Sequence, residues 1–191
     1  PTMYFTLATD GTVRSVNRFG ATQLGYRVEE LIGHSVLNLF HECDKEAVLA
    51  SLCGCLATPE TTRHWEFRKV RKDGSIISVR EAARVGRSST GEAVVLVTCE
   101  DITERKRAEE ELQRSQAFIT SVVENLPNMI FVKDAKDLKF VRVNKASEDL
   151  LGHSREVLIG KSDYDLFRKE EADFFTKKDR QVLESCRLLD I

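Results

Sequence analysis

The sequence has no long apolar run. Its longest uninterrupted apolar segment, Ala93–Val97, is far shorter than the roughly 20 residues that a membrane-spanning helix needs. The first residues also lack a basic stretch followed by an apolar one, which is the pattern of a signal peptide. We therefore expect neither a membrane span nor a signal peptide in these 191 residues. The expected location is the cytoplasm, and any membrane anchor would belong to another part of a longer protein.

No charge of one sign dominates either. There are 29 Lys and Arg residues against 31 Asp and Glu residues, which gives a formal net charge of -2. Such a balance provides no general attraction for a polyanion, so we expect no nucleic-acid partner. Cysteines are few and form no C-x-x-C pair: they are Cys43, Cys53, Cys55, Cys99 and Cys186. An odd number without that spacing favours reduced thiols in the cytosol over a disulfide framework.

Patterns that carry catalysis are also missing. The sequence contains no Walker A, G-x-S-x-G or H-E-x-x-H motif, and its four histidines lie in unrelated contexts. Cys53 and Cys55 lie near each other, but they have no further paired ligands to make the four that a structural zinc site needs. We therefore predict no catalytic residue and no metal site, and we do not expect this chain to be an enzyme by itself.

The sequence does contain an internal repeat. Residues 10–40 align with residues 137–167 at a constant offset of 127, without a gap, and 12 of the 31 aligned pairs are identical. The shared residues are of structural kinds: glycines that can adopt positive φ, an asparagine that can end a strand, and spaced leucines and isoleucines. With 41% apolar and 31% charged residues, the composition suits packed domains. Two copies of one domain explain the pattern.

The first copy predicts an α+β domain. Asp10-Gly11 marks a tight hairpin turn, and Asp44 offers an N-cap for the longest helix. Strands are expected at 3–9, 13–17, 63–70, 76–85 and 93–100, and helices at 18–24, 28–32 and 45–56. This order predicts a five-stranded antiparallel sheet with helices on one face, whose last three strands form a meander.

A linker helix is expected after the last strand. Asp101 or Thr103 can cap its start, and a proline ends it. Between them, apolar and small residues recur at the 4-3-4-3-4 spacing of a coiled-coil seam: Ala108, Leu112, Ser115, Ile119, Val122 and Leu126. Leu112, Ile119 and Val122 are therefore candidates for a dimer seam. Packing of the same stripe against the helix's own domain is the alternative.

Several short motifs follow one another in a characteristic order. They are the D-G turn at 10–11, L-G-Y-x-x-E-E-L-I-G-x-S at 24–35, R-K-D-G-S at 71–75 and D-I-T-E-R-K at 101–106. In the second copy, L-G-H-S-R-E-x-L-I-G-K-S at 151–162 and D-L-F at 165–167 match the same pattern. Together these motifs resemble the PAS family of sensory domains, over nearly all of residues 3–106 and again in the second copy.

The resemblance implies a sensory and dimerisation module, commonly placed before a histidine kinase or a diguanylate cyclase. One function is a sensor that binds a small ligand or relays a conformational signal through the helical linker to an output domain outside the chain. The alternative is a ligand-free dimerisation module. The expected partner is a second copy, bound through the linker helix and the domain surfaces. Asp101 and Thr103 become candidates for the signal relay, beside their possible role in capping.

The candidate ligand pocket lies between sheet and helix. Trp65 and Phe67 share one face of their strand because alternate residues do. Val48 and Leu52 fall on one apolar face of the long helix. These four residues are our ligand-pocket candidates, and plain core packing is the alternative for them.

The resemblance also argues against two cofactors. Flavin photoreceptors of the family carry a reactive cysteine three residues after a glycine that corresponds to Gly33 or Gly160, but those positions hold Val36 and Asp163. Haem-binding members carry an axial histidine on the long helix, and neither 45–56 nor 169–185 contains one. A flavin-cysteine adduct and a histidine-ligated haem are therefore not expected, and the identity of any ligand stays open.

The chain divides unevenly. We expect a first domain at 1–102, a linker helix at 103–126 and the N-terminal part of a second domain at 127–191. The first copy uses about 60 residues after Phe40 for its long helix and three strands, whereas only 24 residues follow Phe167. These suffice for the helix but not for the meander. We therefore expect a truncated second copy that is either partly disordered or completed by another chain.

Overall fold

The computed structural model describes residues 2–185. The chain divides into two compact units between residues 111 and 112, a point inside helix α4 (Thr103–Asn125). Our three-part division at 102/103 and 126/127 is a finer one and stays a prediction. Within the described range, no helix is long and apolar enough to cross a membrane.

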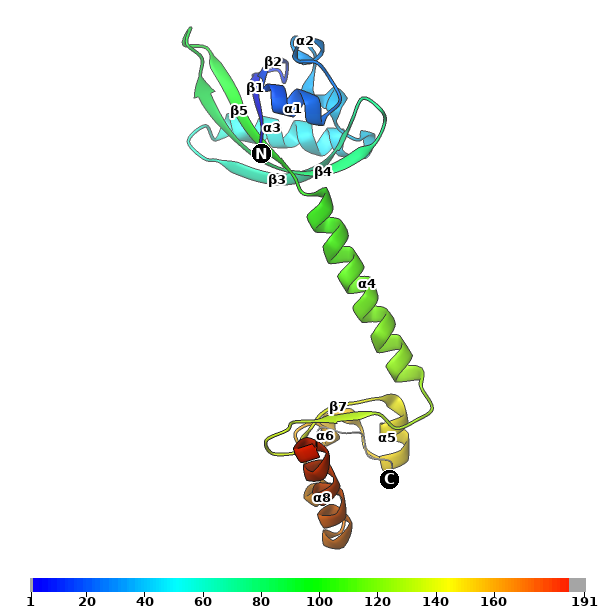
Figure 1. Ribbon diagram of the computed structural model, residues 1–191. Helices are drawn as coiled ribbons and strands as arrows, with labels where there is room; N and C mark the ends of the chain where they lie inside the picture. Colours follow the sequence, from blue (N-terminus) through cyan, green and yellow to red (C-terminus); the bar gives the residue numbers. More distant parts are fainter. Residues whose placement is uncertain (1, 186–191) are drawn as a thin grey trace. The chain divides into compact units, whose positions relative to one another are not determined.

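The first unit is built on a five-stranded antiparallel sheet with the strand order β2-β1-β5-β4-β3 (Figure 1). The last three strands form the predicted meander, and β1 pairs with β5. The predicted α+β fold is confirmed, with strand ends that differ from the prediction by at most two residues. The strands are β1 (Met3–Ala8), β2 (Val13–Val16), β3 (Arg63–Val70), β4 (Ile76–Arg87) and β5 (Ala93–Asp101).

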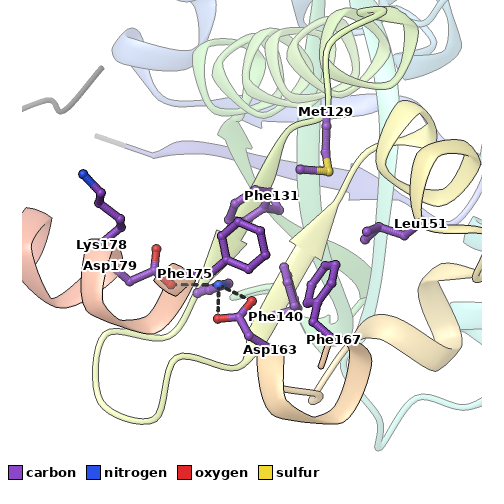
Figure 2. Close-up of a pocket in the computed structure, with 10 residues that line it drawn as sticks. Met129, Phe131, Phe140, Leu151, Asp163, Phe167, Phe175, Lys178 and Asp179 are labelled. Carbon is purple, nitrogen blue, oxygen red and sulfur yellow. Dashed lines mark hydrogen bonds and ion pairs between the residues drawn. The ribbon is translucent and has the colours of Figure 1, made fainter. Parts of the chain in front are cut away.

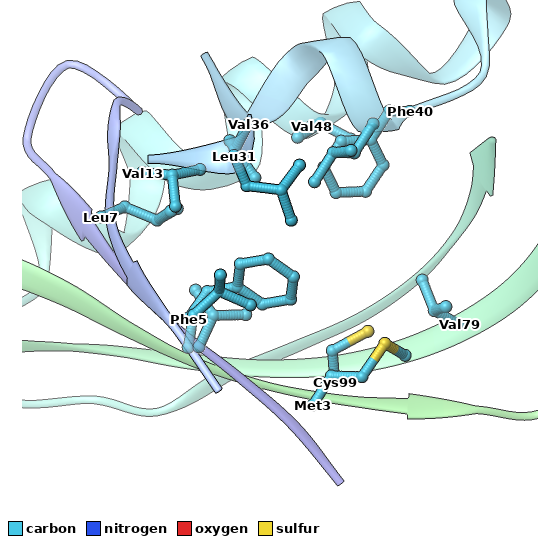
Figure 3. Close-up of a cluster of buried hydrophobic side chains, with 14 of the residues drawn as sticks. Met3, Phe5, Leu7, Val13, Leu31, Val36, Phe40, Val48, Val79 and Cys99 are labelled. Carbon is cyan, nitrogen blue, oxygen red and sulfur yellow. The ribbon is translucent and has the colours of Figure 1, made fainter. Parts of the chain in front are cut away.

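Short helices cover one face of this sheet (Figure 1). They are α1 (Arg18–Gln23), α2 (Val28–Leu31), the 3-10 helices η1 (Val36–Leu39) and η2 (Glu42–Asp44), and α3 (Lys45–Ala57). Side chains from the strands and these helices form one apolar core, in which Phe5, Val48 and Val79 are buried (Figure 3). Burial of each such side chain contributes about 1.5–3 kcal/mol, and this holds the helices on the sheet.

Local sequence explains where the short helices start and stop. The side chain of Asn17 caps α1 by accepting a hydrogen bond of 3.0 Å from the N–H of the third helical residue. Gly25 and Gly33 follow α1 and α2 with φ of 77° and 79°, a left-handed backbone that glycine adopts without strain. The side chain of Asp44 does not cap α3, contrary to our prediction, because its carboxylate accepts hydrogen bonds from Arg68 instead.

The second unit repeats the first part of this fold. A two-stranded antiparallel sheet carries a small core of Phe140, Val143 and Leu158, and these are the only strands among the described residues of this unit. It is therefore the smaller copy that the sequence predicts, and residues 186–191 of its expected range lie outside the described part. Its elements are β6 (Phe131–Lys133), β7 (Phe140–Val143), α5 (Lys145–Leu151), α6 (Arg155–Leu158), α7 (Asp163–Leu166) and α8 (Lys169–Ser185).

Matching hydrogen bonds confirm the repeat. The N–H of Gly33 donates to the carbonyl of Val13 at 2.8 Å, and the N–H of Gly160 donates to that of Phe140, also at 2.8 Å. Gly33 corresponds to Gly160, and Val13 to Phe140, at the offset of 127 found in the sequence. In each hairpin the register shifts once, between the second and third paired positions. The two copies therefore share backbone geometry as well as sequence motifs.

Candidate functional site

Three of the four predicted pocket residues surround one small cavity in the first unit. Val48, Leu52 and Trp65 line a space of about 10 Å³ between α3 and the sheet, which is room for about one water molecule. The fourth, Phe67, lies on the same face of β3, with its ring centroid 6.3 Å from that of Trp65 and 6.1 Å from that of Phe40. That these residues hold a ligand stays a prediction.

An ion pair lies at the same cavity. Lys69 is fully buried, and its ammonium lies 3.1 Å from Oε1 of Glu81, whose side chain is 4% exposed. Nε1 of Trp65 donates a hydrogen bond of 2.8 Å to Oε2 of Glu81. The ring centroid of Phe40 lies 3.8 Å from the ammonium, a cation-π contact. The carboxylate is thus held between an indole and an ammonium inside an apolar core.

The ammonium of Lys69 has unused hydrogen-bonding capacity. It carries three donors, yet it makes no hydrogen bond to any described residue, because the contact with Glu81 lacks hydrogen-bond geometry. A buried donor without an acceptor costs about 1–3 kcal/mol. Since Lys69 lines the cavity, an acceptor placed there would relieve this cost.

We did not predict this pair from the sequence, although the alternation of inward and outward residues along the strands indicates it. Lys69 stands two residues after Phe67 on the inner face of β3, and Glu81 stands two residues after Val79 on the inner face of β4. A charged residue in phase with inward apolar positions, on each of two neighbouring strands, is the signal that identifies the pair.

The predicted relay residues lie where β5 passes into α4. Asp101 ends β5, and its Oδ1 accepts a hydrogen bond of 2.9 Å from the N–H of Thr103. Oγ1 of Thr103 accepts another of 2.9 Å from the N–H of Ser78 in β4. Arg71 lies 3.4 Å from Asp101 and donates to the carbonyl of Gln23 at the end of α1. The junction therefore joins β4, the β3-β4 turn and α1.

A second contact holds the start of α4 to the outer face of the sheet. Glu66 lies on β3 between the pocket candidates Trp65 and Phe67, and its carboxylate is 2.7 Å from Nζ of Lys106 and 3.4 Å from Nη2 of Arg105. The hydrogen bond from Lys106 holds the pKa of Glu66 below its ordinary value. Because Glu66 shares its strand with the pocket residues, a movement of β3 alters this contact.

The predicted seam residues of α4 are exposed. Leu112, Ile119 and Val122 are 59%, 54% and 43% exposed, and the described part of the chain buries no residue of this helix. Phe118, beside them, is also exposed. An open apolar stripe of this kind is typical of a helix that packs against a partner. The partner itself stays a prediction.

The cysteines do not gather into one site. Cys53 is exposed, whereas Cys55, two residues later in α3, is buried. Within residues 2–185, no three His, Cys, Asp or Glu side chains come together as metal ligands. Cys99 is fully buried beside the Lys69 ion pair, and burial raises the pKa of its thiol, which keeps it protonated. Cys186 lies outside the described residues.

The second unit has a wider pocket of about 180 Å³ between its hairpin and α8 (Figure 2). The ammonium of Lys133 lies 2.7 and 2.6 Å from the two carboxylate oxygens of Asp163, and 2.7 Å from Oδ2 of Asp179. From the sequence, Asp163 was notable only because it stands where flavin photoreceptors carry their cysteine. The cluster was not predicted because the three residues are far apart in the sequence. The walls are apolar: Met129, Phe131, Phe140, Leu151, Phe167 and Phe175.

Two family models match the chain, and both describe the PAS fold: one covers residues 1–102 and the other residues 123–190. No curated protein matches the sequence. Among solved structures, the chain is similar to the PAS domain of an HTR-like protein from Haloarcula marismortui, with 31% identity, a TM-score of 0.49, and coverage of 53% of this chain and 82% of that one.

Two further similar structures come from signalling enzymes. A sensory box histidine kinase/response regulator from Burkholderia thailandensis shows 22% identity and a TM-score of 0.49, with coverage of 62% of this chain and 89% of that one. The N-terminal domain of a diguanylate cyclase with a PAS/PAC sensor from Marinobacter aquaeolei shows 18% identity and a TM-score of 0.45, with coverage of 56% and 99%.

Proposed function

The chain belongs to the PAS family of sensory domains, and from that premise we propose that its first unit senses a small molecule and passes the signal through α4 to an output domain. The ligand carries a hydrogen-bond acceptor that meets the ammonium of Lys69. The output domain lies outside this chain, and the resemblance of the sequence motifs implies a histidine kinase or a diguanylate cyclase.

The buried ammonium of Lys69 carries this proposal. A purely structural core is better served by an apolar side chain at this position, because an unsatisfied buried donor is destabilising. A carbonyl, carboxylate or hydroxyl oxygen of a ligand supplies the missing acceptor. The free space is about 10 Å³, so a ligand larger than a water molecule displaces Leu52 or Trp65, which line it. That displacement links occupancy of the pocket to the position of the strands.

Two contacts then carry the change to α4. On the outer face of β3, Glu66 holds Lys106 at 2.7 Å. On β4, the N–H of Ser78 donates to Thr103 at 2.9 Å. The pocket's ion pair joins the same two strands. A ligand that changes the spacing of β3 and β4 therefore changes both contacts that hold the first turn of α4.

Native mass spectrometry of the purified 191-residue chain tests the ligand. We expect a bound small molecule on the wild-type protein and its loss from Lys69→Met, which keeps the side-chain length and removes the donors. Arg84→Met, on the exposed face of β4, is the matched control and should retain the molecule. A wild-type protein with nothing bound, or a molecule that Lys69→Met retains, contradicts the proposal.

Hydrogen exchange tests the relay. We expect loss of the ligand in Lys69→Met to speed exchange at residues 103–107, because the first turn of α4 loses its support from the strands. Thr103→Val keeps the side-chain shape but cannot accept the hydrogen bond from Ser78. In that background the effect of Lys69→Met on α4 should shrink, because only the contact of Glu66 with Lys106 remains to carry it. Equal exchange at 103–107 in the wild type and Lys69→Met would rule the relay out.

A ligand-free dimerisation module is the second candidate, and the exposed seam of α4 favours it. Leu112→Asp with Ile119→Asp places charges on the seam, where they lose apolar burial and repel across a dimer axis. Gln113→Asp with Ala117→Asp adds the same charge on the exposed face of the helix away from the seam, as a control. We expect only the first pair to weaken self-association in sedimentation at micromolar concentration. Unchanged sedimentation would exclude a dimer through this seam.

A further inference from the structure

The second unit contains a pocket whose charge its fold does not require. The cavity of about 180 Å³ has the volume of about six water molecules in the liquid. Four of the ten residues that line it are phenylalanines: Phe131, Phe140, Phe167 and Phe175 (Figure 2). Two of the three residues that carry its ion cluster, Lys133 and Asp163, correspond to the apolar residues Leu7 and Val36 of the first unit.

The ion cluster has a surplus negative charge. Lys133 and Asp163 have side chains that are 8% and 3% exposed, and Asp179 is 28% exposed. The ammonium has three donors, and its three contacts are to both oxygens of Asp163 and to Oδ2 of Asp179. One ammonium and two carboxylates leave a net charge of about -1 at neutral pH. Oδ1 of Asp179 accepts no hydrogen bond from the described residues.

A second lysine borders the pocket without cancelling this charge. The ammonium of Lys178 lies 5.7 Å from the ring centroid of Phe174, which is not a pocket residue. Figure 2 shows that ammonium pointing away from Asp163 and Asp179. The surplus carboxylate therefore faces the cavity, and Lys133 is the only cation among residues 2–185 that pairs with it.

We propose that this pocket binds an organic ammonium ion with an aromatic or alkyl body. The ammonium meets the free oxygen of Asp179, and neighbouring ring faces add cation-π attraction. The apolar walls take the body of the ligand and do not replace the hydration shell of an inorganic cation. A carboxylate ligand is disfavoured, because it adds negative charge and finds the donors of Lys133 already used.

Three probes of matched size test the charge preference by titration calorimetry on the full chain. They are phenethylammonium, phenethyl alcohol and hydrocinnamate, which are cationic, neutral and anionic. We expect phenethylammonium to bind at least about tenfold more tightly than the alcohol, as a hydrogen bond to a charged group provides, and hydrocinnamate to bind most weakly. Equal affinities, or preference for hydrocinnamate, would overturn the proposal.

Two substitutions on α8 locate the site. Asp179→Asn keeps an oxygen acceptor for Lys133 and removes the surplus charge, so it should lower phenethylammonium affinity about tenfold and leave that of the alcohol unchanged. Asp173→Asn makes the same change on the same helix outside the pocket and should alter neither. An unaltered preference in Asp179→Asn refutes the site. If Asp179→Asn loosens β6 and β7 in hydrogen exchange, the wild-type comparison of the three probes decides instead.

This inference concerns the second unit and stands apart from the sensing role of the first. Phenethylammonium binding should persist in Lys69→Met, which removes the proposed ligand contact of the first unit. Failure of either proposal therefore leaves a result that is distinct from failure of the other.

Discussion

The two units place a lysine ammonium in the same hollow, between the hairpin and the long helix, but from different strands. In the first unit Lys69 reaches it from β3 and is paired with Glu81. In the second unit Lys133 reaches it from β6 and is held by Asp163 and Asp179. Since the backbones of the two copies agree, the fold determines the hollow, and each copy supplies its own charges.

Both units line part of this hollow with the same aromatic residues, but the residues on its other side differ between the units. Register and offset pair Phe5 with Phe131 and Phe40 with Phe167, so aromatic walls recur in both units. The other side changes from apolar to charged: Leu7 corresponds to Lys133 and Val36 to Asp163. One backbone geometry can therefore hold two different kinds of site.

Enclosure is the second difference. Strands β3, β4 and β5 cover the first hollow, where the ammonium of Lys69 is fully buried and makes no hydrogen bond to the described residues. The described part of the second unit has no such strands, and the ammonium of Lys133 makes three contacts to carboxylate oxygens. In the first hollow, the ammonium of Lys69 therefore lacks a hydrogen-bond acceptor within residues 2–185. In the second hollow, the carboxylates outnumber the ammonium.

Breaking the buried ion pair of Lys69 and Glu81 should lower the free energy of unfolding more than any other change proposed here. Glu81→Ala leaves the ammonium of Lys69 buried without a counter-charge, and removing one partner of a buried pair costs about 3–5 kcal/mol. Urea unfolding followed by the fluorescence of Trp65, the single tryptophan, measures the free energy of unfolding of the first unit. The double variant Lys69→Met/Glu81→Leu should recover most of it. A loss below about 1 kcal/mol, as at an exposed pair, would show that the pair is not enclosed.

The corresponding break in the second unit should cost less. Lys133→Met leaves two carboxylates without their ammonium, but Asp179 is 28% exposed and water can reach it, so we expect a loss of about 2–3 kcal/mol. Hydrogen exchange of β6 and β7 measures it, since this unit has no tryptophan. Lys139→Met, at a half-exposed lysine of the same hairpin, is the control. A loss as large as that of Glu81→Ala would remove enclosure as the difference between the hollows.

Asn17 and Asn144 cap corresponding helices in the two units, and removing them should cost different but smaller amounts of stability. Among the described residues, Asn17 donates through Nδ2 only to the carbonyl of Thr2, whereas Asn144 is fully buried and donates to the carbonyls of Val123 and Asn128 at 3.0 and 2.9 Å. We expect Asn17→Ala to cost about 1 kcal/mol and Asn144→Ala about 2–3 kcal/mol. Trp65 fluorescence and hydrogen exchange report the two units in turn. Equal losses would mean that the contacts of Asn144 with the end of α4 add nothing.

The fold could be predicted because its signals are local. Strand alternation, the D-G turn and the glycines after α1 and α2 depend on neighbouring residues, and the repeat supplied these glycines twice. The α8 helix of the second copy followed from the residues beyond Phe167. These features need no knowledge of which side chains meet across the domain.

The charged sites could not be predicted in the same way. A lysine or aspartate is exposed in most settings. Strand alternation is a local signal that Lys69 points inward, but only tertiary packing shows that it meets Glu81 and that Asp163 is buried. Lys133 and Asp179 are separated by 46 residues, so no short motif joins them. Asp44 is a similar case. Its position predicted a cap for α3, but its carboxylate accepts hydrogen bonds from Arg68, which is 24 residues away in the sequence.

A surface ion pair in each unit should give the smallest effect and a pH signature. Asp44 accepts hydrogen bonds of 2.6 and 3.0 Å from the Arg68 guanidinium and one of 2.9 Å from its N–H, and the guanidinium holds the pKa of Asp44 below its usual range. Glu124 accepts one of 2.8 Å from Arg155, which lowers the pKa of Glu124, and a longer one from the N–H of Lys145.

A carboxylate whose pKa is lower in the folded state stabilises the fold above its unfolded pKa, and this contribution declines as pH falls through the folded pKa. We expect Asp44→Asn to lower the stability of the first unit by less than about 1 kcal/mol at neutral pH, with the difference from wild type shrinking below about pH 4. Glu124→Gln should do the same in the second unit, more weakly, because its carboxylate has fewer contacts. Urea midpoints from Trp65 fluorescence measure the stability of the first unit, and hydrogen exchange measures that of the second. Both are followed from neutral to acid pH. If the difference in stability between wild type and Asp44→Asn stayed constant in acid, the ionised carboxylate of Asp44 would not contribute to holding η2 on β3.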